Sequence, residues 1–188
     1  MVDRVILVPR WSGRADSDFY PWLARRLREL GWRGEVETAG LRPPDAPEVS
    51  ATVAGVRGRL GSAARAARTV LVGHSVGAQA AMRALAEEGA PVAGLLLVAG
   101  WWTVDRPWPA IQMWMDAPFD WAQTRARAAR RLVLVSTDDP FTSDAARTRR
   151  LFEQRLAAEV RVHDGAAHFN KAEEPAVLAA LSALLGLS

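Results

Sequence analysis

The residues best suited to chemistry are those of Gly73-His74-Ser75-Val76-Gly77, a serine held between two glycines. They fit the pattern G-x-S-x-G and lie between the apolar run TVLV and the helix-forming run VGAQAAMRALAEE. Between a strand and a helix, this pattern lifts a serine hydroxyl above a sheet, where it can act as a nucleophile. Serine and glycine are also common in structural turns and helix caps. The five residues alone leave both interpretations open, so the choice depends on a base and an acid elsewhere in the chain.

Three histidines are candidates for the base that a serine nucleophile requires. His74 lies inside the turn, where we expect its side chain to diverge from Ser75 and to pack or hydrogen-bond beside the site. His163 ends the run VRVH, and His168 lies in the following loop DGAAHFN, from which an imidazole can reach the serine. We therefore predict that His168 is the base, with His163 as the second candidate.

A carboxylate is needed to orient the imidazole and to stabilise the imidazolium that forms during the reaction. The run RLVLVS is followed at once by TDDPFTS, which provides Asp138 and Asp139. The chain order Ser75, one of these two aspartates, then His168 is the order found in α/β-hydrolases. Each member also follows a separate strand-like run, which favours the catalytic interpretation over a structural corner.

The elements that must position these residues can be read from the hydrophobic pattern. Short apolar runs predict strands at Val5–Val8, Glu35–Thr38, Thr69–Val72, Leu95–Ala99, Leu132–Val135 and Val160–His163. Apolar residues at helical spacing predict helices at Phe19–Leu30, Val49–Ala66, Val76–Glu88, Ser143–Ala158 and Glu173–Leu185. Unbroken apolar strands that alternate with helices indicate a mostly parallel sheet covered on both faces. We expect an α/β three-layer sandwich of about six strands, in which ligands bind beyond the carboxyl ends of the strands.

Length and composition limit the classes of protein to consider. With 188 residues, of which 49% are hydrophobic and 24% charged, we expect residues 1–188 to form one globular domain. No apolar run approaches the roughly 20 residues of a membrane helix, and the N-terminal MVDRVILVPRW lacks the pattern of a signal peptide. We therefore expect a cytoplasmic protein without a membrane partner.

The charge of the chain does not indicate nucleic-acid binding. The sequence pI of 10.4 accompanies a net charge of only +3, because all basic residues except Lys171 are arginines. These arginines fall on helix-like segments beside alanine and leucine, where a solvated face explains them, and no nucleic-acid-binding motif is present. The chain has no cysteine, and neither a metal-ligand cluster nor a phosphate-binding loop is visible, so we expect no cofactor.

Several of these motifs together resemble a known family. VGHSVGAQAAMRALAE, LLLVAGW, VSTDDPF and AAHF, with the earlier FYPWLARRLRELG and the later PFDW, are similar to segments of the small, lidless α/β-hydrolases. That family includes retinoblastoma-binding protein nine and related bacterial serine hydrolases, and the resemblance covers nearly the whole chain. It implies a compact fold without a cap domain, Ser75 as nucleophile and His168 as base. It also implies Asp139 as the acid, because the acid of the family precedes the proline, and leaves Asp138 as a neighbour that caps the turn.

The resemblance also implies where an oxyanion would be bound. The donors would be the backbone N–H groups of Val76 and of Trp11, which lies in the loop VPRWSG after the first strand. In the family this loop is rich in glycine, whereas here Arg10 replaces a glycine. Arg10 either narrows the site or supplies a cation for an acidic substrate group. Ala167 replaces the glycine that precedes the base in the family.

Tryptophans concentrate in the segment that follows the fourth strand, WWTVDRPWPAIQMWMDAPFDW, which we expect to be a long loop near the serine. Aromatic side chains suit the binding of an acyl chain or an aromatic group. We predict that at least one of Trp101, Trp102 and Trp108 lines the substrate site. Other tryptophans of the segment, Trp121 above all, are expected in the core.

Together these residues predict a serine hydrolase that cleaves an ester, a thioester or a small amide through an acyl-enzyme on Ser75. Its partner would be a small-molecule or peptide acyl substrate. Two alternatives share the same residues. One is acyl transfer or cyclisation, and the other is a catalytically silent binding protein that uses the tryptophan-rich segment. The sequence does not indicate an oligomeric state.

Overall fold

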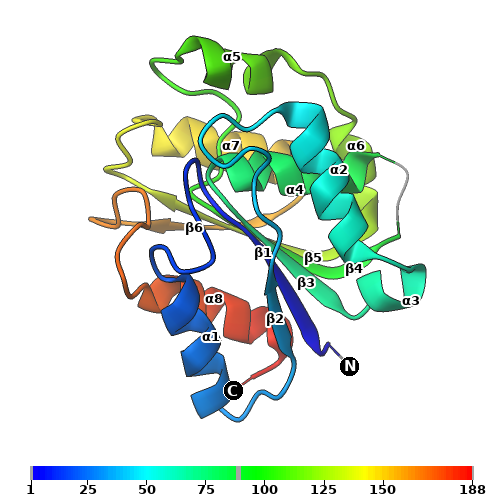
Figure 1. Cartoon of the computed structure of the whole chain (residues 1–188). Helices are drawn as coiled ribbons and strands as arrows, with labels where there is room; N and C mark the ends of the chain where they lie inside the picture. Colours follow the sequence, from blue (N-terminus) through cyan, green and yellow to red (C-terminus); the bar gives the residue numbers. More distant parts are fainter. Residues whose placement is uncertain (1, 88–89, 188) are drawn as a thin grey trace.

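A parallel β-sheet forms the middle of the molecule (Figure 1). The structure is a computed structural model that describes residues 2–87 and 90–187. Within these residues, six strands lie in the order β2-β1-β3-β4-β5-β6, and every neighbouring pair is parallel. The strands are β1 (Arg4–Val8), β2 (Glu35–Thr38), β3 (Thr69–His74), β4 (Val92–Val98), β5 (Ala128–Ser136) and β6 (Glu159–His163). All carboxyl ends therefore meet at one edge, where Ser75, Asp139 and His168 follow their strands.

Helices cover both faces of the sheet, as Figure 1 shows. On one face lie α1 (Tyr20–Glu29) and α8 (Pro175–Leu185). On the other lie α2 (Val49–Leu60), α3 (Ala63–Ala66), α4 (Val76–Ala86), α6 (Trp121–Arg127) and α7 (Ala145–Leu156), with α5 (Pro109–Asp116) outside this layer. Alternate residues of β1 feed the two cores, since Ile6 and Val8 pack with the α4 side while Val5 and Leu7 pack with the α1 side. The predicted three-layer α/β sandwich is confirmed, and the sheet is entirely parallel.

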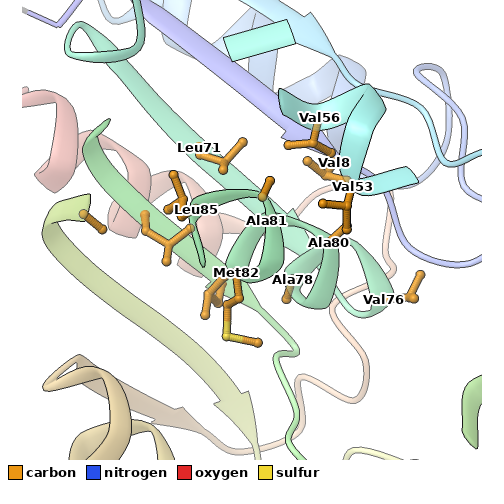
Figure 2. Close-up of a cluster of buried hydrophobic side chains, with 14 of the residues drawn as sticks. Val8, Val53, Val56, Leu71, Val76, Ala78, Ala80, Ala81, Met82 and Leu85 are labelled. Carbon is orange, nitrogen blue, oxygen red and sulfur yellow. The ribbon is translucent and has the colours of Figure 1, made fainter. Parts of the chain in front are cut away.

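Helix α4, which begins directly after Ser75, is buried from Val76 to Leu85. Its small residues Ala78, Ala80 and Ala81 let it lie close to both the sheet and α2 (Figure 2). The larger Met82 and Leu85 belong to the same buried cluster, in which Leu85 lies near Leu71 of β3. A helix buried on all sides is largely apolar around its circumference, which explains the many alanines of α4. The rigid packing of α4 fixes the end that carries the serine.

Three expectations need correction. The helix predicted over Val49–Ala66 is divided, because Gly61 has a φ of +71° and Ser62 then caps α3. The segment expected to be a long loop contains α5, and α6 begins at its end; α5 was missed because it is short, starts at a proline and carries only two buried side chains. Trp121 is 40% exposed and is not a core residue. The predicted end of α4 at Glu88 lies outside the described residues.

The structure gives no sign of a membrane-spanning element: none of the helices in residues 2–87 and 90–187 is both long and apolar enough to cross a bilayer.

The two glycines of the serine turn should differ from other glycines in their tolerance of a methyl group. A Cβ on Gly77 would overlap the carbonyl oxygens of Val8 and Pro9, which belong to the backbone and have little freedom to move. We expect Gly77→Ala to lower the free energy of unfolding by about 3 kcal/mol, measured by urea denaturation.

Gly58→Ala is the matched control, because this helix residue has open space where its Cβ would lie. Alanine has the higher helix propensity, so we expect this variant to be more stable than the parent chain by about 0.5–1 kcal/mol. Equal stability of Gly77→Ala and the parent chain would contradict the close approach of α4 to the end of β1.

Candidate active site

Ser75 occupies a strained turn between β3 and α4. Its φ of 57° and ψ of −118° lie in a region that non-glycine residues rarely adopt. Gly73 and Gly77 make the turn possible, because a Cβ on Gly73 would strike the start of α4 and a Cβ on Gly77 would strike the end of β1. The side chain of Ser75 faces the pocket described below. A strained serine at the amino end of a helix has the geometry of a nucleophile elbow.

The acid and the histidine predicted from the sequence lie in contact. Asp139 follows β5 and His168 follows β6, and the distance between His168 Nδ1 and Asp139 Oδ2 is 2.8 Å. Both residues are buried, with 5% of Asp139 and 6% of His168 exposed. The other carboxylate oxygen of Asp139 accepts a hydrogen bond from the backbone N–H of Phe141. Because a carboxylate only accepts, Nδ1 carries a proton, and in the neutral tautomer of the ring Nε2 is the nitrogen with the lone pair.

Asp138, the alternative acid, has a different set of partners. Its Oδ1 accepts hydrogen bonds from the Ser136 hydroxyl at 2.5 Å and from the Ala167 N–H at 2.9 Å. The hydrogen bond from Ser136 and, to a smaller extent, the hydrogen bond from Ala167 hold the pKa of Asp138 below its usual range. Asp138 therefore joins the turn after β5 to the histidine loop, while Asp139 contacts the imidazole itself.

Ser75 and His168 line the same pocket. In the described part of the chain, no hydrogen bond joins the side chains of Ser75 and His168. The candidate nucleophile and base therefore face the same pocket without a direct hydrogen bond. Such bonds are often long before a substrate binds. The arrangement can take a proton from the serine through Nε2 of His168 once the two side chains approach each other.

His74 forms a buried chain of hydrogen bonds that begins in the loop after β1. The backbone N–H of Arg10 donates to the Tyr20 hydroxyl, which lies 2.8 Å from His74 Nδ1. His74 Nε2 lies 2.8 Å from the carbonyl oxygen of His168. Since this carbonyl can only accept, Nε2 of His74 carries the proton and the Tyr20 hydroxyl donates to Nδ1. The chain thus connects the loop after β1 with the loop that holds the candidate base.

The pKa values of His74 and Tyr20 are shifted so that both side chains stay neutral. Burial, followed by the nearby His168, lowers the pKa of His74 to about 3. Burial raises the pKa of the Tyr20 hydroxyl well above its usual value. Tyr20 was not singled out in the sequence, and its only signal there was its place in the FYPW segment of the family resemblance.

The two predicted oxyanion donors belong to residues that line the pocket with the serine. Val76 is the first residue of α4, so its N–H has no partner within the helix. In the loop after β1, the described hydrogen bonds use the N–H groups of Arg10, Ser12 and Gly13 but not that of Trp11. Both Val76 and Trp11 line the pocket with Ser75. Their N–H groups are therefore available to a ligand, as an oxyanion hole requires.

An apolar pocket of about 140 Å³ opens above the serine. Its walls are largely aromatic, and its lining residues include Trp11, Trp101, Val104, Trp108, Ile111 and Phe141. Ring contacts run without a break from Trp11 through Trp108 and Phe141 to His168. Of the three tryptophans predicted to line the site, Trp101 and Trp108 do so, while Trp102 stacks on Phe119 outside the pocket.

Two buried polar side chains of α4 hold the pocket wall. Gln79 donates to the carbonyl oxygen of Trp101, and Arg83 donates to Gln79 and to the carbonyl oxygens of Trp114 and Ala117 at the end of α5. Burial lowers the pKa of Arg83 to about 10. Sequence reasoning missed both residues, although a glutamine and an arginine on an otherwise apolar helix were a visible signal.

Within residues 2–87 and 90–187, no group of three or more histidine, aspartate or glutamate side chains could hold a metal ion.

Comparison with known proteins shows the family of the chain. A profile of the family described as serine hydrolase matches residues 5–185. The chain belongs to this serine hydrolase family. A search of curated proteins finds no match to the chain.

Solved structures show that the fold of this serine hydrolase is shared with other α/β-hydrolases. The ydeN gene product from B. subtilis has a TM-score of 0.83 at 21% identity, with 98% of this chain and 100% of that chain covered. A structure from a study of carboxylesterases of Nitrososphaera gargenis has a TM-score of 0.72 at 13% identity, covering 98% and 90%. The RedJ thioesterase of prodiginine biosynthesis in Streptomyces coelicolor has a TM-score of 0.64 at 14% identity, covering 96% and 85%.

The low pKa of His74 makes the stability of this serine hydrolase depend on pH. In the unfolded chain His74 takes up a proton as the pH falls below about 6.5, whereas in the folded chain it stays neutral down to about pH 3. Its contribution to stability is therefore complete above about pH 6.5 and is lost as the pH falls toward 3. We expect the free energy of unfolding, measured in urea at several pH values, to fall more steeply below pH 6.5 for the parent chain than for His74→Gln. The difference should approach about 1.4 kcal/mol for each pH unit. Parallel curves for the two proteins would contradict a buried neutral His74.

Proposed function

We propose that this member of the serine hydrolase family cleaves an ester, a thioester or a small amide through an acyl-enzyme on Ser75. The observation that carries the proposal is the buried contact of 2.8 Å between His168 Nδ1 and Asp139 Oδ2, beside a pocket that Ser75 and His168 share. A structural corner would not require this contact, because neither residue belongs to the turn that holds the serine.

In the proposed mechanism, Ser75 Oγ attacks the carbonyl carbon of the substrate while His168 Nε2 takes the hydroxyl proton. Asp139 stabilises the imidazolium that forms and holds the ring in the required tautomer. The negative charge that develops on the carbonyl oxygen is received by the N–H groups of Val76 and Trp11. His168 then gives its proton to the leaving group, and a water molecule repeats the sequence to release the acid and restore Ser75.

The size and lining of the pocket favour a small acyl group. A cavity of about 140 Å³ is similar to engineered apolar cavities of roughly 150 Å³ that bind benzene. The similarity of the fold to a structure from a study of carboxylesterases and to a thioesterase supports ester or thioester cleavage. A cytoplasmic location is part of the proposal, and a small-molecule or peptide acyl compound is the proposed partner.

A fluorophosphonate probe tests the nucleophile. We expect the folded parent chain to be labelled on Ser75, with labelling located by mass spectrometry of the peptides. Ser75→Ala and His168→Ala should lose at least about 10³-fold in kcat/KM on a short-chain ester, because triad members act as a unit. Ser50→Ala, on an exposed position of α2, is the matched serine control and should keep both labelling and turnover.

The outcomes separate the proposal from its alternatives. A folded parent chain that resists the probe, or a Ser75→Ala variant that is still labelled, would refute the proposed nucleophile. Labelling without turnover on esters, thioesters and peptides would instead favour a binding protein. With an added alcohol or amine, release of the free acid identifies hydrolysis, and an acylated alcohol or amine identifies acyl transfer.

A further inference from the structure

One permanent cation lies among the described residues that line the pocket. Most of the lining is apolar, and Ser75, His168 and Asn170 add polar groups, but Arg10 alone carries a fixed positive charge there. From the sequence, Arg10 could either narrow the site or bind an acidic group of the substrate. The contacts of its guanidinium distinguish these roles.

The guanidinium of Arg10 is occupied by the protein itself. Its Nη2 donates to Asp18 Oδ1 at 3.0 Å, and its Nε forms a close ion contact of 2.8 Å with Asp18 Oδ2, although this N–H is not aligned for a hydrogen bond. Its Nη1 donates to the carbonyl oxygen of Trp11 at 2.9 Å. The charge is thus neutralised at the pocket wall, and the side chain is held along the loop after β1.

Asp18 is well placed to keep this charge neutral. The side chain of Asp18 is only 6% exposed, against 30% for Arg10, so solvent screens the pair less than a surface salt bridge. Asp18 has a φ of 51°, a left-handed conformation that aspartate and asparagine tolerate better than other side chains. Turning Arg10 toward a ligand would leave a buried carboxylate without its partner, which is costly.

We propose that Asp18 is a specificity-determining residue: by neutralising Arg10 it restricts the pocket to short, uncharged, apolar acyl groups. The proposal rests on the proposed hydrolase function for its kinetic test. It also makes a statement about ligand binding that does not depend on turnover. An acyl group that ends in a carboxylate would enter an apolar wall without a free cation to pair with it, and would lose its hydration there.

The kinetic test compares two esters that differ by one charge. Phenyl pentanoate is neutral, and the phenyl monoester of pentanedioic acid carries a terminal carboxylate; uncatalysed hydrolysis is subtracted from both rates. We expect the parent chain to prefer the neutral ester. Asp18→Asn keeps the size and the left-handed conformation of the side chain but frees the charge of Arg10. It should shift the ratio of the two kcat/KM values toward the acidic ester by about tenfold or more, in the direction that one added charge–charge attraction requires.

Two further variants show where the shift originates. Asp16→Asn changes the net charge by the same amount at an exposed position of the same loop and should leave the ratio of the parent chain unchanged. The double variant Arg10→Met with Asp18→Asn lacks both charges and should lose the shift, because no cation remains to attract the carboxylate. A circular-dichroism spectrum and a melting curve establish that each variant is folded.

Binding to Ser75→Ala gives a second readout that needs no catalysis. Trp11, Trp101 and Trp108 line the pocket, so their fluorescence should report the binding of pentanamide and of its analogue with a terminal carboxylate. In Ser75→Ala, which retains Asp18, we expect pentanamide to bind more tightly than its acidic analogue. When Asp18→Asn is added, the affinity of the acidic analogue should rise about tenfold relative to that of pentanamide. Equal ratios for the parent chain and Asp18→Asn in both assays, or the same shift in Asp16→Asn, would overturn the role of Asp18. A chain that hydrolyses neither ester but shows the shift in binding refutes the proposed function and keeps this inference.

Discussion

The close approach of α4 to the end of β1 is the contact on which the site depends. At Gly77 the helix backbone lies against the carbonyl oxygens of Val8 and Pro9, closer than any side chain would allow. Because β1 ends there, the loop after β1 starts beside the serine turn, and Trp11 lines the same pocket as Val76. The left-handed strain of Ser75 is therefore the local cost of bringing a strand end, a helix start and a loop together.

The pocket wall depends on polar contacts as much as on apolar packing. Helix α5 has only two buried side chains, so apolar area alone secures it weakly. The buried guanidinium of Arg83 adds to this packing, because it donates hydrogen bonds to carbonyl oxygens at the end of α5. The helix dipole also favours a positive charge at this end. The indole N–H of Trp114 also donates to the carbonyl oxygen of Pro47, which links the same helix to the loop before α2. These hydrogen bonds hold α5, whose Ile111 lines the pocket, against the rest of the chain.

The sequence was most informative where one element determines one property. Fully apolar runs revealed the central strands, and a motif with its flanking elements indicated Ser75, because each signal is local. It was least informative where distant residues must meet. The contact of Tyr20 with His74 joins residues that are 54 positions apart, and no pattern in the sequence predicts it. The pairing of Arg10 with Asp18 lies within one loop, yet it depends on the left-handed turn at Asp18, which the sequence did not predict. Trp121 was misassigned because hydrophobicity alone does not distinguish a buried ring from an exposed one at a helix start.

These buried partners together determine the charge around the serine. Tyr20 and His74 are both held neutral by burial, and Arg10 and Asp18 neutralise each other. Asp139 is then the carboxylate in direct contact with the His168 ring, where a positive charge would form during a reaction. In a partly buried site, an interaction between unlike charges is strong only if other charges do not compete with it. The neutral chain of hydrogen bonds from Tyr20 through His74 to the carbonyl of His168 can therefore orient the histidine loop without opposing an imidazolium at His168. A protonated His74, whose ring centroid lies 5.5 Å from that of His168, would repel this charge.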